Sequence, residues 1–119
     1  MKYYSTRGND GPLGYEEALL SGLARDGGLY LPESYPAFSD DEMRAMADLS
    51  YAALAGRIMS RFTDGELDEA ELAAMASDAY AGFTDPEVAP LHHLNGNIHV
   101  MELFHGPTIA FKDYAMQFL

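Results

Sequence analysis

Hydrophobic residues recur at helical spacing through the middle of the chain. From Tyr51 to Phe62, and again from Leu72 to Phe83, apolar side chains return every three or four residues. Side chains at this spacing share one face of an α-helix, so both runs predict amphipathic helices whose apolar faces pack in a core. A shorter run with the same spacing, from Tyr15 to Ala24, predicts a helix of about two to three turns.

Polar residues mark where these helices are expected to begin. Ser39 and Glu42 form a capping-box pattern, which predicts a short helix ending near Leu49. Ser50 is a second N-cap candidate, directly before the first amphipathic run. The helix after it is expected to begin near Asp68, where acidic residues suit the positive end of the helix dipole.

The beginning of the chain has the residue types of short strands and turns. Tyr3 to Ser5 predicts a short strand, and Gly8 to Pro12 is rich in turn residues. Gly27 and Gly28 precede a second short extended piece. A glycine pair can also belong to a phosphate-binding loop, but the complete glycine fingerprint and a following helix start are both missing. A turn is therefore the favoured interpretation.

Beyond the second amphipathic run the pattern changes from helical to alternating, which predicts a β-hairpin. Asn95 and Gly96 are the residues preferred in a type I′ turn, and the second strand is expected to continue to Phe104. This register places His92 opposite His99 on one face of the hairpin. Because a metal site usually needs a third protein ligand and none is assignable, two partly exposed histidines without a metal are the favoured interpretation.

Composition narrows the classes of function. The chain has 119 residues, enough for about one domain, and a formal net charge of −12. Because lysine and arginine are few, binding of nucleic acid or of an anionic membrane surface is not expected. The absence of cysteine excludes disulfides and thiolate catalysis. The first residues lack the apolar core of a signal peptide and no run has membrane-spanning length, so a cytoplasmic protein is expected.

One of the two lysines in the chain, Lys112, lies where the pattern would place an apolar residue. It follows the turn residues His105 to Thr108 and precedes Asp113, at the expected start of a short buried helix. Burial disfavours the charged form of a lysine, and a neutral amine can form a Schiff base with a carbonyl compound. The alternative, which the residues alone favour, is a structural lysine that lies along Phe111 or pairs with Asp113.

The stretch from Glu102 to Tyr114, Glu-Leu-Phe-His-Gly-Pro-Thr-Ile-Ala-Phe-Lys-Asp-Tyr, resembles the cofactor-lysine motif of threonine synthases. Those proteins are fold-type II enzymes that use pyridoxal 5′-phosphate (PLP). Lys2–Gly8, Gly22–Pro32 and the helical stretch after them resemble the amino-terminal domain of the same family, so the resemblance covers the whole chain. Ile109 and Tyr114 stand where other members often carry leucine and phenylalanine, and both exchanges conserve bulk.

The resemblance implies an α-rich α+β domain with a short strand component over residues 1–85. Residues 86–119 would then be a β-hairpin and the first helix of an α/β catalytic domain of the fold-type II PLP class. The resemblance also implies that Lys112 is catalytic and binds PLP as a Schiff base. Three neighbours of this lysine are candidates for contact with the cofactor: His105, Thr108 and Asp113.

The activity implied by the resemblance is that of threonine synthase, which converts O-phospho-L-homoserine and water to L-threonine and phosphate in the last step of threonine biosynthesis. In that family the phosphate-binding loop and the partner of the pyridine nitrogen lie downstream of the lysine. The chain is therefore expected to be the opening portion of a longer enzyme and to be inactive alone. Two alternatives are a threonine-synthase-like PLP phospho-lyase and a stand-alone helical binding module without enzymatic activity.

Overall fold

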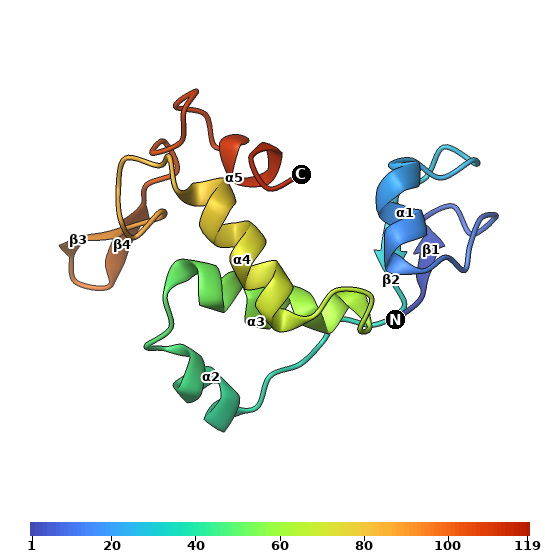
Figure 1. The fold of residues 1–119 in the computed structure, drawn as a ribbon, viewed down its shortest axis with the longest axis horizontal. Helices are drawn as coiled ribbons and strands as arrows, with labels where there is room; N and C mark the ends of the chain where they lie inside the picture. The colour runs from blue at the N-terminus through green and yellow to red at the C-terminus, as the bar shows by residue number, and fades with distance from the viewer.

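Helices α3 and α4 form the centre of the computed structural model, which describes residues 1–119 (Figure 1). α3 spans Tyr51–Thr63 and α4 spans Glu69–Tyr80, so both predicted amphipathic helices are confirmed. The two helices pack on each other, and Leu72 and Ala76 of α4 are completely buried. Met75, an apolar residue three positions after Leu72 in the predicted run, is 45% exposed. It precedes Ala76 by one position and therefore points about 100° away around the helix.

Side-chain caps fix the start of three helices. The Ser50 hydroxyl accepts a hydrogen bond from a backbone amide in the first turn of α3. Asp68 and Glu71 form a reciprocal capping box at the start of α4. The predicted capping box at Ser39 begins α2, which spans Asp40–Met46 and so ends before Leu49. These caps satisfy amides that have no partner within the helix, which is why polar residues predict helix starts from sequence.

Residues 1–32 form a small amino-terminal lobe at one end of the α3–α4 pair (Figure 1). The Tyr3 hydroxyl donates a hydrogen bond of 2.8 Å to the carbonyl oxygen of Phe62 in α3. The Glu66 carboxylate, from the α3–α4 turn, accepts hydrogen bonds from two amides in the first turn of α1. These contacts attach the lobe to the helix pair. Its elements are an antiparallel strand pair and one helix: β1, Tyr3–Ser5; β2, Tyr30–Pro32; and α1, Tyr15–Ser21.

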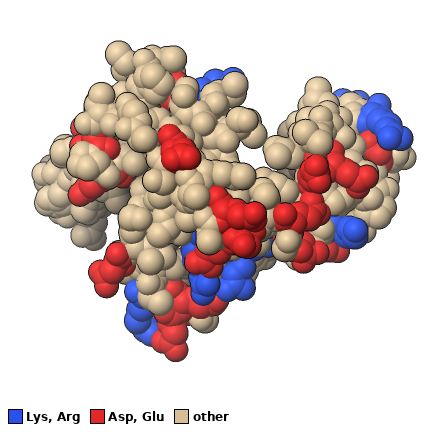
Figure 2. Space-filling model, in the orientation of Figure 1, with Lys and Arg blue, Asp and Glu red and all other residues tan.

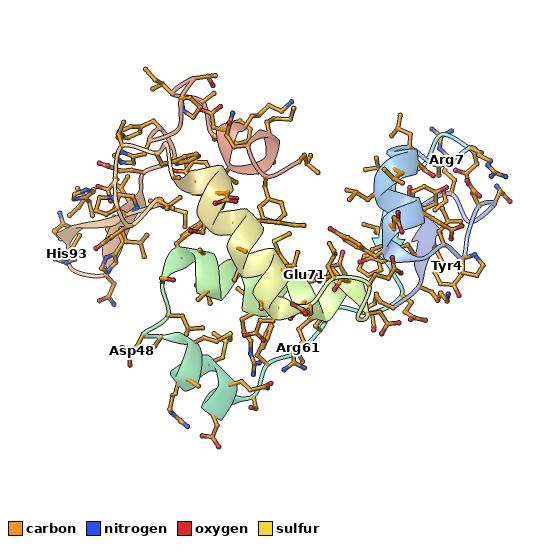
Figure 3. All side chains as sticks on the ribbon, in the orientation of Figure 1. Tyr4, Arg7, Asp48, Arg61, Glu71 and His93 are labelled. Carbon is orange, nitrogen blue, oxygen red and sulfur yellow. The ribbon has the colours of Figure 1, made fainter.

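The predicted β-hairpin lies at the other end of the α3–α4 pair, with His93 on one strand (Figure 3). Its strands are β3, Leu91–Asn95, and β4, Ile98–Met101. β4 ends at Met101 and does not continue to Phe104 as expected. Every residue of both strands is exposed, so the hairpin adds little to the core of this chain.

The register of this hairpin differs from the predicted one. His92 pairs with Val100, and His93 lies opposite His99, so the prediction that His92 faces His99 is wrong. A type I′ turn needs positive φ at both central residues, but here φ is positive, at 53°, only at Gly96. The pairing shifts by one residue just before this turn, and a shift of one residue moves a side chain to the opposite face.

The last helix, α5, spans Asp113–Met116 and lies beside the end of α4. The Tyr80 hydroxyl of α4 donates a hydrogen bond of 2.7 Å to the Tyr114 carbonyl oxygen. The whole is a small α+β structure with five helices and two two-stranded antiparallel sheets. None of its helices combines the length and apolar character needed to cross a membrane. On the face shown in Figure 2, acidic side chains gather where the amino-terminal lobe meets the helix pair.

Candidate functional site

Lys112 lies directly before α5 and lines an apolar cavity of about 650 Å³. It is the only lysine or arginine in that lining. The other lining residues come from α3, from the hairpin strands and the residues that flank them, and from α5 and the residue before Lys112: Tyr51, Leu54, Ala89, Leu91, Met101, Leu103, Phe111, Tyr114 and Ala115. The structure therefore presents one primary amine to a predominantly apolar and aromatic surface.

The side chain of Lys112, which the sequence places at the start of a helix expected to be buried, is exposed in this chain. The opening portion of a longer enzyme is expected to expose apolar surface from Phe104 to Leu119, and here Met116 of α5 is 58% exposed and Leu119, which follows α5, is 78% exposed. The apolar flank read from the sequence is therefore present without the burial. An ion pair with Asp113, the structural alternative, is also absent, because the Asp113 carboxylate bonds elsewhere.

Asp113 is 3% exposed, and both of its carboxylate oxygens contact Thr108. Oδ2 accepts a hydrogen bond of 2.8 Å from the Thr108 amide, and Oδ1 accepts one of 2.7 Å from the Thr108 hydroxyl. Two of the predicted site residues are therefore brought together. They bond to each other and close the turn that precedes Lys112.

His105, the remaining candidate, uses both ring nitrogens in contacts within the chain. Its Nε2 lies 2.7 Å from the Glu102 carboxylate, and its Nδ1 lies 3.1 Å from the Thr84 hydroxyl. The same Glu102 carboxylate lies 3.5 Å from His92 Nε2. His105 therefore joins the segment after α4 to the segment after β4, and it does not line the cavity of Lys112.

The amino-terminal lobe and the central helices correspond to a known family. Residues 2–80 match the family model described as threonine synthase N terminus. The chain belongs to the threonine synthase family. The resemblance drawn from the sequence motifs is thereby confirmed for the family, although the lysine motif itself lies after the matched residues.

Individual threonine synthases extend this similarity over the whole chain. The threonine synthase of Pseudomonas aeruginosa is 48% identical over 119 residues, which are 100% of this chain and 25% of that protein. A PLP-bound threonine synthase from Brucella melitensis has the same fold with a TM-score of 0.93 and 50% identity, over 99% of this chain and 25% of that one. Threonine synthase-like 2 from Xenopus laevis is 38% identical over 98% of this chain and 25% of its own length. The chain thus spans about a quarter of these threonine synthase relatives.

The contacts of the aromatic residue Tyr114, beside Lys112, were not predicted from the sequence. The Tyr114 hydroxyl donates a hydrogen bond of 2.6 Å to the Val88 carbonyl oxygen, and Phe83 packs edge-on against the Tyr114 ring. Burial raises the pKa of the Tyr114 and Tyr80 hydroxyls. Tyrosine was read as a bulk-conserving exchange for phenylalanine, and only the approach of residue 88, 26 positions away, shows that its hydroxyl has a partner.

Two of the three hairpin histidines, His93 and His99, lie against each other. The His93 and His99 rings have centroids 5.1 Å apart, and His93 Nε2 lies 2.9 Å from the Gly96 carbonyl oxygen. The structure contains no group of three or more His, Cys, Asp or Glu side chains placed to hold a metal ion.

Proposed function

We propose that this chain forms part of a threonine synthase that carries PLP on Lys112 and converts O-phospho-L-homoserine and water to L-threonine and phosphate. The observation that carries the proposal is the single primary amine on an apolar cavity of about 650 Å³ in a chain of this family. The only other lysine, Lys2, lies in the amino-terminal lobe.

The residues around Lys112 fit one end of PLP. Its aldehyde needs a primary amine, and the cavity has the size and the apolar, aromatic lining usual for sites of small molecules and cofactors. No second lysine or arginine lines the cavity to meet the phosphate group. We therefore assign the phosphate and the pyridine nitrogen to residues outside these 119, and expect the chain alone to be inactive.

Bound PLP supplies an electron sink for the negative charge that develops on the substrate. The part of Lys112 is proton transfer: its Nζ, released as a neutral amine, removes the proton from the α carbon of the substrate and returns a proton later. Phe111 and Tyr51 line the cavity beside it and supply aromatic surface there. The neutral amine requires desolvation, which the remaining walls of the cavity must supply because Lys112 is exposed in this chain.

Borohydride reduction of the full-length, PLP-loaded protein tests the assignment. Reduction fixes the cofactor to its lysine, and we expect the pyridoxyl mass on the peptide that contains Lys112. Lys112→Ala is expected to abolish labelling and threonine formation, whereas Lys2→Ala, which removes the other lysine of this chain, is expected to change neither. Pyridoxyl on a different peptide, or threonine formation by Lys112→Ala, would refute the proposal.

A threonine-synthase-like PLP phospho-lyase is the second candidate. It is favoured by the similarity of this chain to a threonine synthase-like protein as well as to threonine synthases. Both activities release phosphate, but only threonine synthase forms one threonine for each phosphate from O-phospho-L-homoserine. Phosphate release without threonine would select the phospho-lyase.

A further inference from the structure

The side chain of Asp113 points away from the cavity that Lys112 lines. Asp113 is absent from the cavity lining, whereas its neighbours Lys112 and Tyr114 both belong to it. Adjacent residues of a helix point about 100° apart, so a buried Asp113 directs Lys112 towards the other side. Both oxygens of Asp113 already accept hydrogen bonds from Thr108. The carboxylate of Asp113 is therefore engaged with the backbone and side chain of Thr108 and not with the cavity.

The turn held by these bonds has a strained backbone. Ile109 adopts φ of 63°, a left-handed conformation that is rare and unfavourable for a β-branched residue. Its amide donates a hydrogen bond of 3.1 Å to the Gly106 carbonyl oxygen. Gly106 also lies against Asp113, because a Cβ at position 106 would be 2.4 Å from the Asp113 Cβ. Such a turn persists only where surrounding contacts hold it, and Asp113 supplies three of them.

We propose that Thr108 and Asp113 are positioning residues for Lys112. The two hydrogen bonds between them hold the strained turn, the turn fixes where α5 begins, and the start of α5 directs the Lys112 amine to the apolar cavity. The geometric inference stands on the contacts above, and its consequence for catalysis rests on the proposed attachment of PLP to Lys112.

Exchanges at position 108 in the full-length protein separate the hydroxyl from the bulk of the side chain. Thr108→Val keeps the shape but leaves Asp113 Oδ1 without its donor, whereas Thr108→Ser keeps the donor. We expect Thr108→Val to slow the attachment of added PLP to Lys112, which borohydride trapping at successive times measures. We also expect it to lower kcat on the order of 10²-fold with little change in KM. Thr108→Ser is expected to restore both.

Thr6→Val is the matched control, because it also removes one hydroxyl that takes part in a single hydrogen bond, from the Leu29 amide in the amino-terminal lobe. It is expected to leave the trapping rate and kcat unchanged. Asp113→Asn is a second variant that keeps size: its amide oxygen can accept from the Thr108 amide while its NH₂ donates to the hydroxyl. Near-normal trapping in Asp113→Asn is expected if geometry, and not charge, is what Asp113 supplies.

The outcomes distinguish this inference from the proposed function. Failure of the unaltered protein to be labelled on Lys112 would refute the proposed function. Normal labelling of the unaltered protein together with unchanged trapping and kcat in Thr108→Val would overturn the positioning inference alone. Loss of trapping in Asp113→Asn, with normal trapping in Thr108→Val, would overturn it as well, because the charge would then be the active property.

Discussion

Two β-branched residues near Lys112 have left-handed backbone conformations. Val88 and Ile109 both have φ of 63°, and each is held by a contact from the segment around α5. The Val88 carbonyl oxygen accepts from the Tyr114 hydroxyl, and the turn at Ile109 is closed by Asp113. A strained backbone conformation persists only where surrounding contacts hold it. We therefore expect the side chains of Tyr114 and Asp113 to stabilise these two turns.

Tyr114→Phe tests this at one atom. The exchange removes the donor to the buried Val88 carbonyl and is expected to lower the free energy of unfolding by about 1–2 kcal/mol. Tyr35→Phe is the control, because Tyr35 is 71% exposed and a surface exchange changes stability by less than about 0.5 kcal/mol. Urea unfolding followed by circular dichroism measures the free energy of unfolding of both variants. Equal values would show that the Tyr114 hydroxyl does not stabilise the fold.

At this scale the sequence indicated which residues to consider, but it did not indicate their partners. Lys112 stood out as a lysine in an apolar run, and the contact of Thr108 with Asp113 spans only five positions. One of the two partners of His105, Thr84, lies 21 positions away on another segment, where no spacing rule applies. The exposure of Lys112 has a related cause. Whether a side chain is buried depends on the segments that pack around it in space and not on its neighbours in sequence.

Among the elements, the helices followed the sequence because their signals are local. Caps and apolar spacing act within a few residues, and α2, α3 and α4 begin where Ser39, Ser50 and Asp68 predicted. The hairpin existed as expected, but its register depended on the backbone angles of two turn residues. Of the turn residues only Gly96 adopts positive φ, and in the observed register His93, instead of the predicted His92, lies opposite His99. The division into residues 1–85 and 86–119 stays a prediction.

The crossing of α3 and α4 gives a prediction at the scale of elements. Alanine is the better helix former by about 1 kcal/mol, yet a Cβ at Gly56 would lie 2.6 Å from the Glu69 carbonyl oxygen and 2.9 Å from the Ala73 Cβ. We expect overpacking to prevail, so that Gly56→Ala lowers the free energy of unfolding by about 1–3 kcal/mol. Gly82→Ala, with no atom within 4 Å of its added Cβ, is the control and should be neutral or slightly stabilising. Thermal unfolding of both variants measures the difference.

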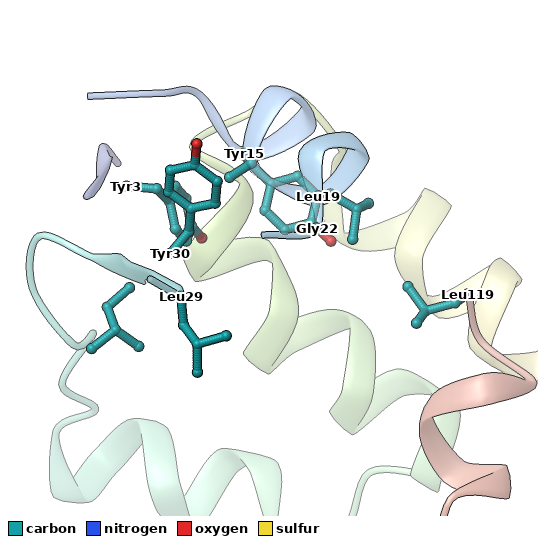
Figure 4. A pocket seen from close by; sticks show the side chains of 9 residues that line it. Tyr3, Tyr15, Leu19, Gly22, Leu29, Tyr30 and Leu119 are labelled. Atoms are coloured by element: carbon teal, nitrogen blue, oxygen red, sulfur yellow. The ribbon is translucent and has the colours of Figure 1, made fainter. Parts of the chain in front are cut away.

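In the whole molecule the amino-terminal lobe lies at one end of the α3–α4 pair, and the hairpin and α5 lie at the other end. The attachment of the amino-terminal lobe depends on contacts between positions that are distant in sequence. Glu66 caps α1 from 50 positions away, a link that no local pattern predicts. Leu119, the last residue, lines an apolar cavity of about 490 Å³ together with Tyr15, Leu19 and other residues of the lobe (Figure 4). Within the lobe, the loops are held largely by the carboxylates of Asp10 and Asp26.

This dependence on carboxylates predicts that acid weakens the amino-terminal lobe. The Ser5 hydroxyl, followed by the Gly28 and Asn9 amides, holds the pKa of Asp26 below its ordinary value of 3.8. Because folding lowers this pKa, the stabilisation is present above about pH 4 and is lost as pH falls through the lower folded value. Asp26→Asn should therefore be less stable than the unaltered protein at pH 7, with a difference that shrinks towards pH 3 in urea unfolding. The control is Asp48→Asn, because Asp48 is exposed and its carboxylate accepts no hydrogen bond (Figure 3). It should have the free energy of unfolding of the unaltered protein at every pH. If Asp26→Asn were less stable by the same amount from pH 7 to pH 3, the Asp26 carboxylate would not be the source of the pH dependence.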